Sequence, residues 1–118
     1  SRATLAPLLS KELGLVRFAE LSAPEIHNLV RGLYPWPGAY TFFHGKRVKL
    51  LRSMVAAEAS RGNPGDFWVE GDRLFVACAK GTALEMLELQ LEGKRPMLPR
   101  EFENGIKGQA PQFSPESA

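Results

Sequence analysis

Residues 39–55 read Ala-Tyr-Thr-Phe-Phe-His-Gly-Lys-Arg-Val-Lys-Leu-Leu-Arg-Ser-Met-Val and predict two strands joined by a tight turn. The first strand, residues 39–44, is rich in the aromatic and β-branched residues that favour sheets. Gly45 and Lys46 are predicted to form the tight turn between the two strands. Because side chains alternate between the faces of a strand, Val48 and Leu50 share one apolar face. The opposite, mostly basic face carries Arg47, Lys49 and Leu51.

The charge of the protein is unevenly distributed along the chain. Residues 1–52 hold eight Lys or Arg and three acids, whereas residues 53–118 hold seven Lys or Arg and ten acids, for a net charge of +2. Such a split favours a surface with a basic face, which attracts polyanions such as phosphate backbones. On charge alone, a phosphate-binding face and an ordinary solvated face both remain open.

A helix is predicted over residues 23–33. Ser22 lies three residues before Glu25, a spacing at which each side chain can satisfy a free backbone N–H of the first turn. Apolar residues then recur at helical spacing, one turn after another. They are Ile26, Leu29, Val30 and Leu33.

The remaining elements are predicted with less regular patterns. Residues 67–79 indicate a hairpin around Gly71-Asp72, and residues 100–104 a short helix. Residues 82–92 combine helix-forming Ala, Leu, Glu and Met with a strand-like alternation, and propensity alone favours a helix there. Residues 1–21 lack sustained periodicity and are interpreted as a linker.

The sequence contains no recognisable catalytic or metal-binding set. Two histidines and one cysteine are too few for the three or four ligands of a zinc site, and there is no Gly-rich phosphate loop or nucleophile turn. Cys78 alternates with Leu74 and Val76, which indicates a small core residue. A single cysteine fits a reducing compartment. No apolar run reaches the ~20 residues of a membrane span, so we expect no membrane contact.

Residues 31–41, Arg-Gly-Leu-Tyr-Pro-Trp-Pro-Gly-Ala-Tyr-Thr, resemble the C-terminal domain of methionyl-tRNA formyltransferases. Further segments match that family in order. Residues 6–12 are similar to its entry into the domain, and residues 45–50 to its Gly-Lys-x-Val/Leu-Lys strand. Residues 89–97 and 101–105 are similar to its Leu-Gln-x-x-Gly-Lys-Lys/Arg-x-Met segment and its final helix.

The resemblance implies a mainly β fold, with a small OB-like β-barrel, a helix on its N-terminal side and a short C-terminal helix. It therefore implies a strand, in place of the helix that propensity favours, at residues 82–92. Residues 1–21 would then be a lead-in from an N-terminal catalytic domain absent from this sequence. Residues 22–105 would form the barrel domain, and residues 106–118 a flexible tail.

The function that this resemblance implies is non-catalytic tRNA binding. The domain would position initiator Met-tRNA for N-formylation from 10-formyltetrahydrofolate in translation initiation. That cofactor would bind the N-terminal Rossmann-like domain of the same protein, so none is expected here. We expect a monomer in the cytoplasm or, alternatively, the mitochondrial matrix. By position, the expected tRNA phosphate contacts are Lys46, Arg47, Lys49, Lys94 and Arg95, with Arg31 and Arg52 as weaker candidates.

Two other functions remain open. Related barrels accompany formyltransferases that act on small molecules such as nucleotide sugars, and the barrel would then only pack on a catalytic domain. A stand-alone OB-type binder would instead stack single-stranded bases on exposed aromatic residues. Its candidates are Trp36, Phe43 and Trp68, for which core packing is favoured. One continuous basic face would indicate tRNA binding, whereas pairing with the acids of residues 85–103 would indicate packing.

Overall fold

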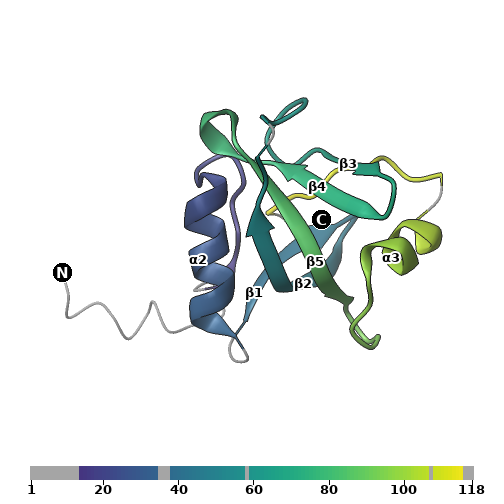
Figure 1. The fold of residues 1–118 in the computed structure, drawn as a ribbon. Coiled ribbons are helices and arrows are strands. Elements are labelled where there is room, and N and C mark those ends of the chain that lie inside the picture. The colour runs from purple at the N-terminus through teal and green to yellow at the C-terminus, as the bar shows by residue number, and fades with distance from the viewer. Residues whose placement is uncertain (1–13, 35–37, 58, 107, 116–118) are drawn as a thin grey trace.

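The computed structural model describes residues 14–34, 38–57, 59–106 and 108–115, and is built on one antiparallel sheet of five strands (Figure 1). The strands are β1 (Ala39–Phe43), β2 (Lys46–Val55), β3 (Phe67–Glu70), β4 (Arg73–Ala77) and β5 (Ala83–Leu91). The helices are α2 (Ala23–Leu33), the 3-10 turn η3 (Ala79–Gly81) and α3 (Pro99–Gly105). This arrangement confirms the mainly β fold with one helix before the strands and a short helix after them.

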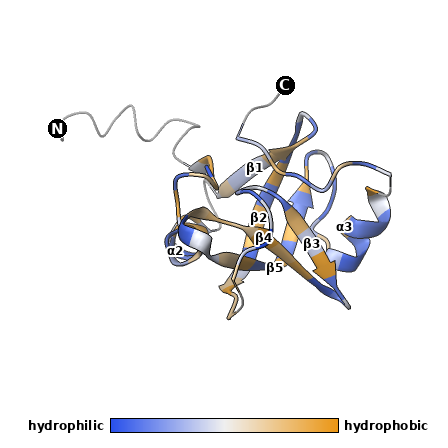
Figure 2. Cartoon of the chain, turned by 90° about the horizontal axis from the view of Figure 1, so that it is seen from above, coloured by the Kyte–Doolittle hydropathy of each residue, from blue (hydrophilic) through white to orange (hydrophobic). Residues whose placement is uncertain are grey.

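The sheet is open rather than closed by strand pairing. Its order is β1-β2-β5-β4-β3, so β1 and β3 form the two edges among the described residues. Figure 2, seen from above, shows apolar colour concentrated on the strands and a largely hydrophilic α3. The core lies between the inner face of the sheet and the helices, and it includes Val48, Leu50 and Leu89.

The turn between β1 and β2 lies one residue earlier than predicted. His44 and Gly45 form it, with φ values of 49° and 85°. Positive φ at both central residues is typical of the type I′ turn, whose twist matches that of the flanking strands. Lys46 is consequently the first residue of β2, paired with Phe43.

The predicted alternation along β2 holds until a bulge. Val48 and Leu50 are buried, and Arg47 lies on the exposed side. At Arg52 the pairing with β5 slips, and the next buried residue is Ser53. Because a bulge re-aims the side chains around it, Arg52 is turned into solvent.

Residues 83–91 form a strand, β5, so the interpretation taken from the family resemblance is confirmed and the helix favoured by propensity is wrong. β5 is the central strand and pairs with β2 on one side and β4 on the other. Its inward side chains Leu84, Met86 and Leu89 are fully buried. Two hydrogen-bonded neighbours and this apolar burial outweigh a propensity difference of a few tenths of a kcal/mol per residue.

The helix α2 forms as its capping pattern predicts. The backbone N–H of Ser22 donates a hydrogen bond of 2.8 Å to a carboxylate oxygen of Glu25, which lowers the pKa of that carboxyl. Ile26 and Val30 on the apolar stripe are buried against the sheet. In the ranges that the structure describes, no helix combines the length and apolar character that crossing a membrane requires.

Part of the segment interpreted as a linker, residues 1–21, packs on the domain, and residues 1–13 of it lie outside the described ranges. Val16 and Phe18 are buried in the core. The backbone N–H of Val16 donates to the Tyr40 carbonyl at 2.8 Å, beside the bridge between Leu15 and β1. The apolar residues of this segment form no sustained repeat, so only the tertiary structure reveals that Val16 and Phe18 are buried.

Part of the segment expected to be a flexible tail, residues 106–118, packs on the sheet. Ile106 is buried, and Phe113 is 3% exposed. The backbones of Phe42 and Ser114 exchange two hydrogen bonds of 2.9 Å, and the Phe113 N–H donates to the Gly65 carbonyl at 2.8 Å. The segment therefore runs from the start of β3 to β1 and covers parts of both sheet edges, an arrangement that protects unpaired edge strands.

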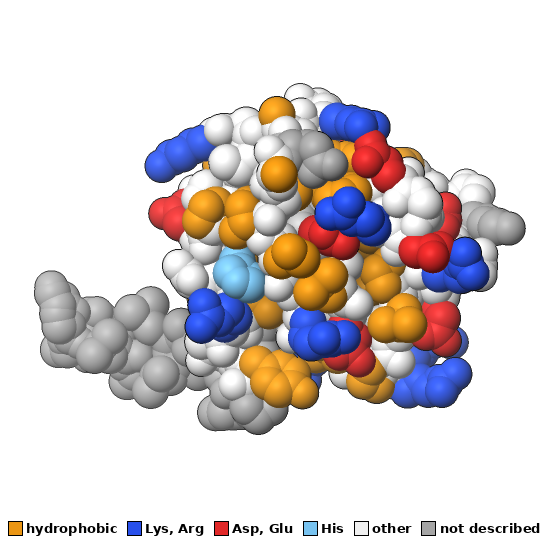
Figure 3. All heavy atoms as spheres, viewed as in Figure 1, with side chains coloured by type: hydrophobic (Ala, Val, Ile, Leu, Met, Phe, Trp, Pro, Cys, Tyr) orange, Lys and Arg blue, Asp and Glu red, His pale blue; other side chains and the backbone are white. Residues whose placement is uncertain are grey.

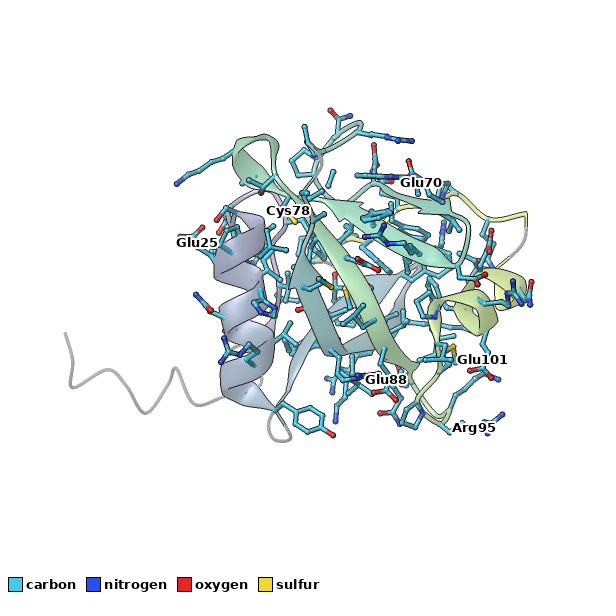
Figure 4. All side chains as sticks on the ribbon, in the orientation of Figure 1. Glu25, Glu70, Cys78, Glu88, Arg95 and Glu101 are labelled. Carbon is cyan, nitrogen blue, oxygen red and sulfur yellow. The ribbon has the colours of Figure 1, made fainter. Side chains whose placement is uncertain are left out.

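Cys78 is a core residue, as predicted, and its thiol should be chemically inert in the folded chain. It is 2% exposed, and burial raises its pKa from 9.0 to about 12 (labelled in Figure 4). Since the thiolate is the reactive species, Ellman's reagent at pH 8 should leave the native thiol unmodified and titrate one thiol per chain in urea. Rapid modification without denaturant would contradict this burial.

Candidate nucleic-acid interface

The first group of predicted phosphate contacts lies at the end of the sheet where β2 begins and β5 ends. The Glu92 N–H donates to the Arg47 carbonyl at 2.8 Å, and the Lys94 N–H to the Leu91 carbonyl at 3.0 Å. The turn after β5 is thereby held beside the start of β2. The exposed residues that this brings to one end of the sheet are Lys46, Arg47, Lys94 and Arg95.

Arg47 and Lys49 extend this group along the outer face of β2. Lys49 pairs with Tyr40 on β1 and with Gln90 on β5, so it lies on the face opposite the core. The Arg47 guanidinium lies 4.7 Å from the centre of the Tyr40 ring. A cation–π contact of this kind contributes ~0.5–1 kcal/mol and holds the guanidinium close to the sheet.

The second group, Arg31 and Arg52, lines a groove at the C-terminal end of α2. The groove has a volume of about 580 Å³. In its wall, Nδ1 of His27 and Oγ of Ser53 lie 3.0 Å apart in a hydrogen bond that ties α2 to β2. The bulge at Arg52 is what brings this side chain to the same groove as Arg31.

Acids of β5 and α3 neutralise some of the candidates. Nε of Arg52 lies 3.1 Å from Glu88, and Arg95 lies 3.7 Å from Glu101 (Figure 4). Figure 3 shows red and blue side chains interspersed over this view of the molecule. Exposed ion pairs contribute about 0–1 kcal/mol, so a phosphate can replace the carboxylate at little cost. Among the described residues, the side chains of five candidates have no ion pair with an acid: Arg31, Lys46, Arg47, Lys49 and Lys94.

The three aromatic candidates for base stacking differ in their burial and in whether the structure describes them. Phe43 is buried, which confirms core packing, whereas Trp36 lies outside the described residues. Trp68 is half-buried: its ring stacks on Phe75 at 5.7 Å, and the Arg61 guanidinium lies 5.4 Å from its centre. That ring is therefore in contact with two other side chains.

Sequence reasoning missed Tyr34, which is 57% exposed beside the groove. It follows Val30 by four residues, and a continuing helix would place it on the buried stripe. α2 ends at Leu33, however, and Tyr34 already has an extended backbone with φ −79° and ψ 138°. Because the helix ends before it, Tyr34 does not continue the buried stripe and is a surface aromatic residue.

Carboxylates elsewhere are engaged by guanidinium groups. Glu85 accepts two hydrogen bonds from Arg73, at 2.9 and 3.2 Å, and Asp72 pairs with Arg100. Over the part of the chain that the structure describes, no three His, Cys, Asp or Glu side chains come together in a way that could hold a metal ion.

Comparison with known proteins identifies the family. The family described as "Formyl transferase, C-terminal domain" matches residues 8–107. The methionyl-tRNA formyltransferase of Acidobacterium capsulatum is 49% identical over 105 residues, which cover 89% of this chain and 33% of that protein. The methionyl-tRNA formyltransferase of Koribacter versatilis is 47% identical over 104 residues, covering 88% of this chain and 32% of that protein.

A third relative shows the same pattern at lower identity. The methionyl-tRNA formyltransferase of Caldanaerobacter subterraneus is 42% identical over 100 residues, 85% of this chain and 32% of that protein. The chain thus spans about a third of the length of the curated relatives that it matches. With 100 consecutive residues matched by the family and relatives of up to 49% identity, the chain belongs to the formyl transferase C-terminal domain family.

Proposed function

We propose that this chain is the tRNA-binding C-terminal domain of a methionyl-tRNA formyltransferase. The observation that carries the proposal is the group of cations at the start of β2 and the turn after β5. Lys46, Lys49 and Lys94 are without an acidic partner among the described residues, and Arg47 is held over Tyr40. Long cationic side chains on a rigid strand suit the regular spacing of a phosphate backbone.

The proposed role is to position the substrate. Phosphate contacts made by this domain hold initiator Met-tRNA, so that its amine meets the formyl donor with less loss of rotational and translational entropy. 10-Formyltetrahydrofolate binds the N-terminal Rossmann-like domain of the same protein, and this domain holds no cofactor. The protein acts as a monomer in the cytoplasm, in translation initiation.

The ion pairs indicate which of the proposed phosphate contacts contribute most to tRNA affinity. Arg52 and Arg95 share their charge with Glu88 and Glu101, so they contribute less to phosphate binding than Lys46, Lys49 and Lys94. Such exposed pairs are held weakly, and a phosphate oxygen offers the same guanidinium a stronger partner. We therefore assign the main affinity to the unpaired lysines and to Arg47.

Fluorescence anisotropy with labelled tRNA tests the proposal. The chain should bind both initiator and elongator tRNA, with an affinity that falls steeply between about 50 and 200 mM salt as counterion release weakens. Similar affinity for both would be expected of phosphate contacts, which do not read sequence. A nucleotide sugar should not compete. No tRNA binding at the lowest salt would rule out the proposed function.

The alternative is a barrel that only packs on a catalytic domain acting on a small molecule. The acid-paired arginines favour it, and so do the exposed apolar side chains of Met54, Val55 and Leu98. Under this alternative the chain binds its N-terminal domain but not tRNA. The same anisotropy titration therefore distinguishes the two functions.

A further inference from the structure

The groove at the C-terminal end of α2 differs from the phosphate contacts of β2. It brings apolar, cationic and aromatic side chains together. Val30, Leu51 and Leu87 give it an apolar lining. Arg31 and Arg52 add positive charge, and Tyr34 adds an aromatic ring. Its volume of about 580 Å³ lies within the ~300–1,000 Å³ of small-ligand sites.

Tyr34 is available as a stacking surface. Its side chain is 57% exposed, and in the described chain it has neither a ring contact nor a hydrogen bond. This distinguishes it from Trp68, whose ring contacts both Phe75 and Arg61. An exposed ring beside an apolar lining offers a planar base both a stacking partner and a place away from water.

The cations of the groove favour an anion of low charge. Arg31 is exposed and has no acidic partner within the described ranges. Arg52 binds Glu88 through Nε, which leaves its two terminal nitrogens for another acceptor. Because Nδ1 of His27 is bonded to Ser53, only its Nε2 remains for a ligand. The nearby carboxylate of Glu88 repels a multiply charged anion more than a phosphodiester, which carries one charge.

We propose that this groove binds one unpaired nucleotide of an RNA strand, with the base against Tyr34 and the apolar lining and the phosphodiester at Arg31. The inference rests on the proposed function and adds the binding of a base to it. Lys46, Lys49 and Lys94, in contrast, would contact backbone phosphates whatever the conformation of the RNA. A base can reach the groove only where it is unstacked and unpaired, as in a loop or a single-stranded end. The domain would therefore hold both the backbone and one exposed base.

A single-stranded RNA hexamer with one 2-aminopurine provides the probe for the 118-residue chain. Binding should quench 2-aminopurine fluorescence, because the base stacks on Tyr34. Tyr34→Ala should weaken hexamer binding about fivefold to a hundredfold, and Tyr34→Phe, which keeps the ring, should bind like the wild type. Since Tyr34 is exposed, all three proteins should melt at similar temperatures.

The charge contact has its own matched pair of variants. Arg31→Gln should weaken hexamer binding and lower the slope of log affinity against log salt by about one. Lys80→Gln removes the same charge near the other end of α2, where the Ala79 N–H donates to the Leu21 carbonyl. The N-terminal end of α2 lies about 12 Å along the helix axis from Arg31, so Lys80→Gln should leave the quenching unchanged.

The outcomes separate this inference from the proposed function. If tRNA binds but Tyr34→Ala and Arg31→Gln both match the wild type and 2-aminopurine keeps its emission, the groove inference fails alone. If neither tRNA nor the hexamer binds, both fail. Adenosine monophosphate that competes as tightly as the hexamer would make the occupant a free nucleotide, and would overturn the assignment to an RNA strand.

Discussion

Phe113→Ala should lower the free energy of unfolding by about 3 to 5 kcal/mol, as truncation of a fully buried aromatic residue does. The Phe113 ring lies 4.4 Å from that of Phe67 and 5.9 Å from that of Phe18, measured between centres. It therefore joins the N-terminal segment, the sheet and the C-terminal segment in one cluster. Because domains are stable by only about 5–15 kcal/mol, the loss is a large share of the total.

Urea unfolding followed by circular dichroism measures this effect. Gln112→Ala is the matched control, since Gln112 is exposed in the same segment and its bridge to Asp66 is made by the backbone. It should change stability by less than about 0.5 kcal/mol. Phe113→Leu, which keeps an apolar side chain, should fall between the two. If Phe113→Ala unfolds at the same urea concentration as Gln112→Ala, the C-terminal segment does not belong to the core.

The elements that the sequence predicted are those whose signals are local. Ser22 and Glu25 lie within one turn of each other, and the apolar stripe of α2 repeats every turn, so both features appear in a short window. The hairpin of β3 and β4 is likewise specified by Gly71 and its neighbours. For these elements, local preference and tertiary packing agree.

The elements that were missed depend on contacts between distant parts of the chain. Val16 and Phe113 are buried by residues far away in sequence, and neither belongs to a sustained apolar repeat. β5 was predicted as a strand only through the family resemblance, because its helix-forming composition is overridden by pairing with two strands. Tyr34 has no role in the sequence-based prediction, although the predicted helix over residues 23–33 already ends before it.

The sequence predicts which basic residues form the candidate interface, but not which of them are paired with acids. The basic run of β2 is visible in the sequence, and the turn after β5 repeats it. The antiparallel register, however, places Glu88 opposite Arg52 and Glu92 beside Arg47. The pairing of residues between β2 and β5 cannot be read from the sequence of either strand alone. Only the structure therefore distinguishes the paired arginines from the unpaired lysines.

Replacing Lys46, Arg47 and Lys49 together with alanine should weaken tRNA binding on the order of a hundredfold at low salt. Each lost phosphate contact lowers the slope of log affinity against log salt by about 0.9. From about 50 to 200 mM salt, the wild-type affinity should therefore fall about fortyfold more than that of the triple variant. Filter binding or anisotropy at several salt concentrations measures both quantities.

The control must separate a local loss of contacts from a general loss of charge. Arg61, Lys80 and Arg100 lie in a loop, in η3 and in α3, so their replacement by alanine removes the same three charges outside the interface. That control should retain most of the affinity and nearly the wild-type salt slope. Loss of Arg47 from the Tyr40 ring should reduce stability by only ~0.5–1 kcal/mol, so the first variant stays folded. Equal weakening by both triple variants would mean that net charge, and not the outer face of β2, determines tRNA affinity.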